Sequence, residues 1–292
     1  MKAKIAVAVM FCLAAWNASA EDTLKKIADS GKMTLAFRES SVPFSYDAGT
    51  GKPLGLAAEI SDAVAAEVKR TLGKNVEVSY QAVTSANRIP LLVNGTIDLE
   101  CGSTTNNTTR GKEVQFAINH FYTGTRMLTK KTSGINNYAD IANKTISTTT
   151  GTTNAVVMRK YIAEKNLNAN IIFGKDHSDS MLLVDADRAV AFAMDDVLLF
   201  GLIATAKNPA AWHVVGDSLQ VEPYACMLRK DDPKFKALVD KVIGGMMKSG
   251  EFEKLYNKWF MSPIPPNNIN LNLPMSPELR QNLKDLSDKP AT

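Results

Sequence analysis

Apolar and polar positions alternate along the chain in blocks that predict strands separated by helices. Apolar residues recur every fourth position from Leu56 to Leu72, and Gly73 follows, which predicts a helix with a C-terminal glycine. The first part of the chain is predicted to contain a strand at 34–37, this helix, a strand at 76–82, a short helix at 87–93 and a strand at 97–101. Because parallel strands need long crossovers, this βαβαβ order favours a mostly parallel sheet flanked by helices.

A second series of the same kind follows. Strands are expected at 126–130, 145–149, 171–173, 189–194 and 212–215, with helices from about 152, after 179 and at 197–206. A strand at 224–229 and a helix with an apolar stripe from Phe235 to Met246 come next. Prolines and asparagines beyond Phe260 predict an irregular tail with one further helix at 276–286. The chain is therefore predicted to be α/β and two-lobed.

The N-terminus has the features of a secretory signal peptide at residues 1–20. Lys2 and Lys4 precede an apolar run that ends at Trp16, and Ala18 and Ala20 provide the small residues of a cleavage site. A membrane anchor is the alternative, but the run is shorter than the roughly 20 residues that a spanning helix needs. We expect a secreted protein without stable membrane insertion.

Composition and cysteine content refine this prediction. The 292 residues are 45% apolar and 22% charged, as in a globular chain, and a net charge of +4 gives no reason to expect nucleic acid as a partner. Cys12 lies in the predicted signal peptide, so Cys101 and Cys226 remain in an oxidising compartment. We favour one disulfide between them; the alternative is two buried thiols.

Three arginines follow predicted strands of the first lobe. Arg38, Arg88 and Arg110 lie in loops 38–46, 85–88 and 102–110, which should gather at the carboxyl ends of the strands. A guanidinium binds a carboxylate with two parallel hydrogen bonds, and Ser103 and Thr105 add neutral donors. The sequence therefore predicts an anionic ligand.

The second lobe offers further polar groups at the ends of its strands. Small hydroxyl residues at 149–153 open a helix, either as a carboxylate site or as plain N-capping by Thr152. His177 also follows a strand. Asp195 ends the strand at 189–194 and suits a cationic ammonium group.

The motifs of enzymes are absent from the sequence. Asp176, His177 and Ser178 are adjacent, but no G-x-S-x-G motif or glycine-rich phosphate loop is present. The histidines His120, His177 and His213 are not spaced as metal ligands. We therefore expect no catalytic residues, no metal and no cofactor.

From about Thr23 to the tail, the sequence resembles the periplasmic glutamate/aspartate-binding proteins of bacterial polar amino-acid ABC transporters, which have the type II periplasmic-binding fold. The matching segments are 38–46, 87–92, 100–107, His177, 194–196, 224–232, 259–260 and 263–266. Ala86 and Thr108–Thr109 depart from the family pattern beside the binding positions.

The resemblance implies a role for each candidate residue. Arg38, Arg88 and His177, assisted by Ser85, would hold the side-chain carboxylate of the ligand. Arg110, Thr105 and Thr153 would hold its α-carboxylate. Asp195 and Ser103 would bind its α-ammonium group.

The resemblance implies a binding protein for transport, and an enzyme on the same fold is the alternative. A periplasmic monomer would close on L-glutamate or L-aspartate and deliver it to an inner-membrane ABC permease. Lobe 1 would comprise 21–126 and 220–292 and lobe 2 would comprise 127–219, joined by a hinge of two crossings. The alternative is an enzyme on the same fold, similar to a cyclohexadienyl dehydratase, acting on a small carboxylate.

Overall fold

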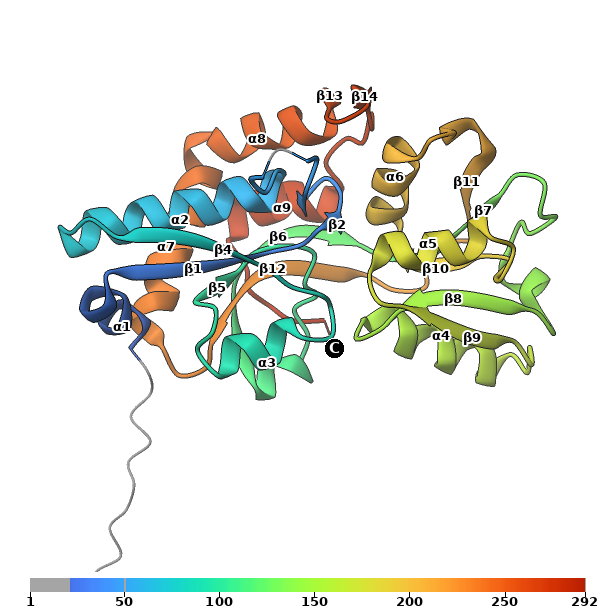
Figure 1. Ribbon diagram of the computed structural model, residues 1–292, viewed down its shortest axis with the longest axis horizontal. Helices are drawn as coiled ribbons and strands as arrows, with labels where there is room; N and C mark the ends of the chain where they lie inside the picture. Colours follow the sequence, from blue (N-terminus) through green and yellow to red (C-terminus); the bar gives the residue numbers. More distant parts are fainter. Residues whose placement is uncertain (1–21, 50, 292) are drawn as a thin grey trace, which may run out of the picture.

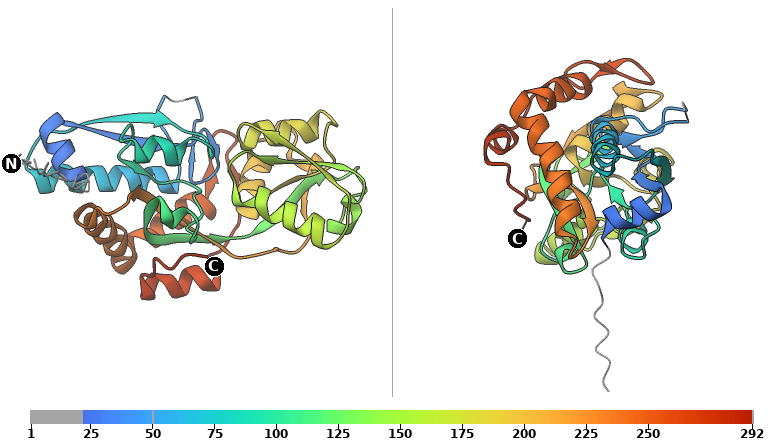
Figure 2. Two further views of the ribbon diagram at one scale, coloured as in Figure 1. Left: turned by 90° about the horizontal axis from the view of Figure 1, so that it is seen from below. Right: turned by 90° about the vertical axis from the view of Figure 1, so that its left-hand side faces the viewer.

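The computed structural model describes residues 22–49 and 51–291, which form two α/β lobes lying side by side (Figures 1 and 2). The predicted signal peptide, with Cys12, lies outside the described residues. No helix in the described part of the chain combines the length and the apolar character needed to cross a membrane.

The first lobe is built on a five-stranded sheet. Its strands, in spatial order, are β4 (Glu77–Ala82), β1 (Lys32–Phe37), β5 (Leu99–Glu100), β12 (Glu222–Arg229) and β6 (Val114–Thr123). β1 is parallel to β4 and β5, whereas β12 is antiparallel to β5 and β6. A small hairpin, β2 (Ser40–Ser41) with β3 (Ser45–Tyr46), follows β1.

The second lobe repeats this plan with its own five-stranded sheet. The spatial order is β11 (Trp212–Val215), β7 (Thr125–Lys130), β10 (Phe192–Asp195), β8 (Thr145–Thr149) and β9 (Asn170–Gly174). β10, β8 and β9 are parallel, and β7 is antiparallel to β10 and β11. The α/β class, the two lobes and the mostly parallel sheets are confirmed. In each five-stranded sheet four strands run in one direction and one runs against them, namely β12 in the first lobe and β7 in the second. Each reversed strand directly follows a crossing between the lobes.

Helices cover both sheets. Those of the first lobe are α1 (Thr23–Ser30), α2 (Leu56–Leu72), α3 (Arg88–Val93), α7 (Pro233–Ser249), α8 (Glu251–Phe260) and α9 (Pro277–Asp285). Those of the second lobe are α4 (Thr153–Glu164), α5 (His177–Asp185) and α6 (Asp196–Thr205). The apolar residues at every fourth position predicted both ends of α2 correctly. Gly73 follows the helix in the left-handed conformation, with φ 59°. α5 begins earlier than predicted, so that His177 is its first residue.

Among the longer elements, α1, α8 and the strand β6 were not predicted; the two-residue strands of the small hairpins were not predicted either. Almost every residue of β6 is buried, and the strand carries Asn119 and His120 at its centre. A strand that is buried on both faces has no alternation of apolar and polar residues, so its sequence pattern is weak.

An aromatic cluster in the core of the first lobe supports the loops that follow its strands. Phe44 packs edge-on against Phe121, Tyr224 and Phe260, with ring centroids 4.8, 5.2 and 5.5 Å away. Cys101 and Cys226 form the predicted disulfide, with an S–S distance of 2.07 Å, which joins the end of β5 to β12. These contacts hold in place the strand ends from which the polar loops begin.

The remaining chain beyond α8 forms a short hairpin, β13 (Pro263–Ile264) with β14 (Ile269–Asn270), before α9. This hairpin region reaches the second lobe, because Asn267 Nδ2 donates a hydrogen bond of 3.1 Å to the carbonyl of Ala204 at the end of α6.

Candidate functional site

The candidate residues converge on a small, tightly closed cavity between the lobes. They come from segments that follow β1, β4 and β5 in the first lobe and β8, β9 and β10 in the second. These are the parallel strands of each sheet, so the site lies at their carboxyl ends. Eight of the nine predicted residues line the cavity: Ser85, Arg88, Ser103, Thr105, Arg110, Thr153, His177 and Asp195.

Arg38 is the ninth, and it lies behind the lining. Its buried guanidinium donates from Nη2 to Asp176 Oδ1 at 2.6 Å and lies 3.5 Å from Ser103 Oγ through Nη1. Ser40 Oγ donates to the other oxygen of Asp176 at 2.7 Å. Burial opposes the charge of Asp176, but the Arg38 guanidinium and the Ser40 hydroxyl favour the carboxylate and lower its pKa. Arg38 therefore joins the two lobes through an ionised carboxylate.

His177 lies between this ion pair and β8. Its Nε2 is 3.3 Å from Arg38 Nη2, and its Nδ1 is 3.0 Å from Thr149 Oγ1. A guanidinium only donates, so Nε2 accepts and the proton lies on Nδ1, facing Thr149. Burial and the charge of Arg38 lower the pKa of His177 to about 3. The neutral ring thus orients Arg38.

Arg88 lines the cavity together with Ser85 and is 2% exposed. Its Nε and Nη1 have no hydrogen-bond partner among the described residues, and the same holds for Ser85 Oγ. The carboxylate of Glu100 is 4.0 Å from Arg88 Nη1, which is too far for a hydrogen bond. Burial and the nearby Arg110 lower the pKa of Arg88 to about 9. Arg88 therefore presents a buried cation with free N–H groups to the cavity.

Arg110 also lines the cavity, and it is held by the protein. Nη1 donates to the carbonyl of Thr105 at 2.9 Å, and Nη2 donates to the carbonyl of Gly151 in the second lobe at 3.3 Å. A guanidinium has five N–H donors, so donors remain for a ligand. Gly151 has φ +80°, and a Cβ atom there would lie 2.7 Å from the Cα of Ala86. Only glycine permits this approach of the lobes.

A buried glutamate, which the sequence analysis did not single out, lies beside Arg110. Glu222 Oε2 accepts hydrogen bonds from Thr153 Oγ1, at 2.6 Å, and from Thr105 Oγ1. Gln220 contacts its other oxygen. Glu222 thereby joins the second crossing between the lobes to a loop of the first lobe and a helix of the second. Its neighbours in sequence carry no motif, so only the fold reveals it.

Asp195 is buried and doubly hydrogen-bonded. Asn154 Nδ2 donates to Oδ1 at 2.7 Å, and the hydroxyl of Tyr224 donates to Oδ2. Burial and the charge of Glu222 raise the pKa of Asp195 well above 3.8. A cation placed against this carboxylate would favour its ionised form.

The cavity lining is completed by residues that were not predicted as ligands, namely Thr152, Asn154 and Met194. Thr152 is the N-cap of α4, and its side chain accepts from the backbone N–H of Ala155 at 3.4 Å. The capping interpretation of segment 149–153 is therefore confirmed. The described residues contain no group of three or more histidine, cysteine or acidic side chains that could hold a metal ion.

Comparison with known proteins adds independent information. The model of the bacterial extracellular solute-binding proteins, family 3, matches residues 33–262. The L-glutamate/L-aspartate-binding protein of Pseudomonas aeruginosa is 47% identical, covering 92% of this chain and 90% of its own length. The glutamate/aspartate import solute-binding protein of Escherichia coli K12 is also 47% identical, over 93% and 90%.

Among solved structures, ArgBP from T. maritima superimposes with a TM-score of 0.72 at 24% identity. The match covers 81% of this chain and 98% of ArgBP, and it shows that the fold is shared. The curated relatives with 47% identity are solute-binding proteins, which favours a binding protein over an enzyme on the same fold.

Proposed function

The chain belongs to the bacterial extracellular solute-binding proteins, family 3, and we propose that it captures acidic L-amino acids, glutamate or aspartate, in the cavity between its lobes. The observation that carries this proposal is the Arg88 end of the cavity. A buried guanidinium with two unpartnered N–H groups, beside an unpartnered Ser85 hydroxyl, is costly unless an anion completes it. The side-chain carboxylate of an acidic amino acid supplies that anion.

The rest of the cavity suits the groups that all amino acids share. Arg110 is held in place by two carbonyls and has donors left for the α-carboxylate. Thr105 and Thr153 lie beside it. Asp195 provides the counter-charge for the α-ammonium group, with Ser103 as a further acceptor.

Arg38 and His177 support the side-chain end. We propose that Arg38 adds positive charge next to the ligand carboxylate and keeps the lobes closed through Asp176. His177, neutral in this arrangement, orients Arg38. A direct bond from either residue to the ligand remains a prediction of the family resemblance.

The cellular setting of this function follows from the family and from the sequence. We propose that residues 1–20 are cleaved on export, that the protein acts in the periplasm and that it delivers its ligand to an inner-membrane ABC permease. The two curated relatives with 47% identity carry names that describe glutamate and aspartate binding or import. We also propose the lobe limits given above, with the hinge at the β6–β7 and β11–β12 crossings.

Calorimetric titration of the secreted protein tests the proposal. L-Glutamate and L-aspartate should bind, and L-glutamine should bind about 30-fold to several thousand-fold more weakly, because its neutral amide offers the Arg88 guanidinium one acceptor oxygen and no negative charge. L-Arginine and succinate complete the series, since the first lacks the acidic side chain and the second lacks the ammonium group. Preferential binding of glutamine or arginine would contradict the proposal.

A further inference from the structure

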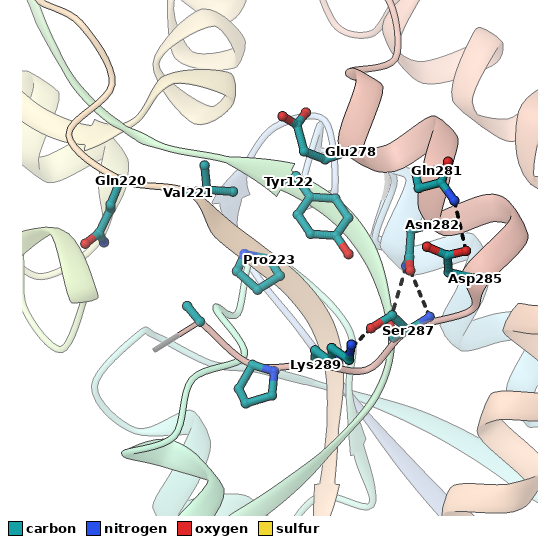
Figure 3. A pocket seen from close by; sticks show the side chains of 12 residues that line it. Tyr122, Gln220, Val221, Pro223, Glu278, Gln281, Asn282, Asp285, Ser287 and Lys289 are labelled. Carbon is teal, nitrogen blue, oxygen red and sulfur yellow. Dashed lines mark hydrogen bonds between the residues drawn. The ribbon is translucent and has the colours of Figure 1, made fainter.

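The last described residues, 287–291, form an extended segment that we call the C-terminal strap. It follows α9 and runs back along the hinge side of the first lobe (Figures 1 and 3). The groove between it and β6 and β12 is lined by Tyr122 and Pro223 on one side and by Asn282 and Lys289 on the other. The family model ends at residue 262, so the strap lies beyond the part of the fold that the family model describes.

Two buried asparagines connect the strap to the sheet. Asn119, in β6, is fully buried; its backbone N–H donates to the carbonyl of Ser287 at 2.9 Å and its Nδ2 donates to that of Lys289 at 2.9 Å. Asn106 Nδ2 donates to the carbonyl of Asp288 at 2.8 Å and to Asn119 Oδ1 at 3.0 Å. The strap carbonyls therefore satisfy amide groups that are inaccessible to water.

Asn106 belongs to the loop that carries Thr105 and Arg110. The strap continues along this loop, where the N–H of Ala291 donates to the carbonyl of Asn106 at 2.9 Å and the carbonyl of Ala291 accepts from Thr108 at 3.4 Å. Asn107, which pairs with Ala291 as a parallel bridge, accepts the backbone N–H of Arg110 through Oδ1 at 2.9 Å. The strap thus acts as an additional strand beside the loop.

The loop is also held from the side of the sheet. Toward the sheet, the N–H of Asn106 donates to the carbonyl of Pro223, and Thr105 pairs with Tyr224 in an isolated bridge. The strap covers the opposite edge of the loop. Ala291 also lines a groove on the outer side of Arg110, together with Thr153 and Glu222.

We propose that the C-terminal strap is a positioning element for the α-carboxylate end of the ligand site. It holds loop 105–110 in the conformation in which Arg110 meets its ligand, and it acts through that loop without contacting the ligand. Preorganisation of this kind raises affinity because less conformational freedom is lost on binding. The inference rests on the proposed function, since it concerns the group that every amino-acid ligand shares.

The test uses two full-length variants. Ala291→Pro removes one N–H donor at a partly exposed position, and Ala291→Ser, which keeps the N–H, is its matched control. Asn119→Asp replaces the Nδ2 donor to Lys289 by an oxygen. We expect Kd for glutamate to rise about 3- to 10-fold in Ala291→Pro and in Asn119→Asp, with Ala291→Ser unchanged. Every amino acid that binds should weaken by the same factor, because the strap acts on the shared α-carboxylate.

Two further measurements separate positioning from a general loss of stability. Ile60→Val lowers the stability of the first lobe at a fully buried residue of α2 and should leave Kd unchanged. Amide hydrogen exchange at Thr108 and Arg110 should speed up in the strap variants and not in Ile60→Val, with or without ligand. Unchanged exchange in Ala291→Pro, or faster exchange with unchanged Kd, would overturn the inference. A wild-type protein that binds no acidic amino acid would instead contradict the proposed function, and the exchange data would still decide whether the strap holds the loop.

Discussion

At the Arg110 end of the cavity the protein satisfies its own charged groups, whereas at the Arg88 end it leaves buried donors without a partner. Arg110 donates to two carbonyls, and Asp195 accepts from Asn154 and Tyr224. By contrast, Arg88 Nε and Nη1 and the Ser85 hydroxyl make no hydrogen bond within the described structure. The two ends therefore have different roles in binding.

The satisfied end is preorganised for the α-carboxylate and α-ammonium groups, which do not vary between amino acids. The unsatisfied end is completed only by a ligand with a second carboxylate, so selectivity resides there. A buried donor without a partner costs about 1–3 kcal/mol, and more when it is charged. Substitutions at the two ends should therefore have different effects on affinity and selectivity.

Removal of Arg110 should have the largest effect. Arg110→Ala deletes a buried partner of the α-carboxylate, and the loss of such a charged hydrogen-bonded pair costs about 2–5 kcal/mol, or roughly 30- to several thousand-fold in affinity. Glutamate, aspartate and any weakly bound amino acid should all be affected. Calorimetry on a variant whose circular dichroism matches the wild type would settle the matter, and near-normal Kd values would refute the assignment.

Removal of Arg88 should have a selective and somewhat smaller effect. In Arg88→Ala the affinity for acidic ligands should fall by about 30- to 300-fold, the lower part of the same range, because Arg38 still adds positive charge nearby. Glutamine should bind about as weakly as it does to the wild type. The ratio of the glutamate and glutamine Kd values is the quantity to measure. An equal loss of affinity for both ligands would show that Arg88 does not bind the side-chain carboxylate.

The two ends should also respond differently to pH. Burial and Glu222 raise the pKa of Asp195, and a ligand ammonium lowers it again by favouring the carboxylate, so binding expels a proton. Affinity should be complete above the free-state pKa of Asp195 and fall as the pH drops through it. His177, with a pKa of about 3, should add no dependence between roughly pH 6 and 8.

Titrations in two buffers of different ionisation enthalpy measure this proton release directly. Asp195→Asn should abolish it, although affinity will also fall. Glutamate affinity that decreases as the pH is raised above 6 would mean that His177 takes up a proton and pairs with the ligand itself.

Removal of the Ser85 hydroxyl should have the smallest effect. Ser85→Ala deletes a buried group that has no partner, so stability should be unchanged or slightly higher, while acidic ligands weaken about 2- to 10-fold. Ser103→Ala is the matched control, because Ser103 Oγ already lies 3.0 Å from Ser41 Oγ. Thermal unfolding with and without glutamate distinguishes the two; a stability loss in Ser85→Ala alone would indicate a structural role.

Local sequence patterns identified much of this architecture. The apolar period of α2, the strands that precede polar loops and the two cysteines of the disulfide were all recognisable. The residues on the loops could be predicted because carboxyl ends of parallel strands meet at one edge. That rule placed eight of the nine candidates on the cavity.

The rest depends on contacts between distant segments. β6 is buried on both faces and lacks alternation, so this strand was not predicted, and the reversed direction of β12 between β5 and β6 was not visible. Glu222 became part of the site only because β12 returns between the lobes. Arg38 was expected against the ligand, but its place behind His177 depends on Asp176 from the other lobe. These pairings span 69 residues between Thr153 and Glu222 and 138 residues between Arg38 and Asp176, and they leave no local sequence pattern.

A crystal structure of the protein with L-glutamate bound tests the central claim most directly. The account predicts that the side-chain carboxylate lies within hydrogen-bond distance of Arg88 Nε or Nη1 and of Ser85 Oγ, with the α-carboxylate on Arg110 and the ammonium group on Asp195. A ligand bound in the reverse orientation, with its α-carboxylate on Arg88, or a complex in which the Arg88 N–H groups stay unpartnered, would contradict it.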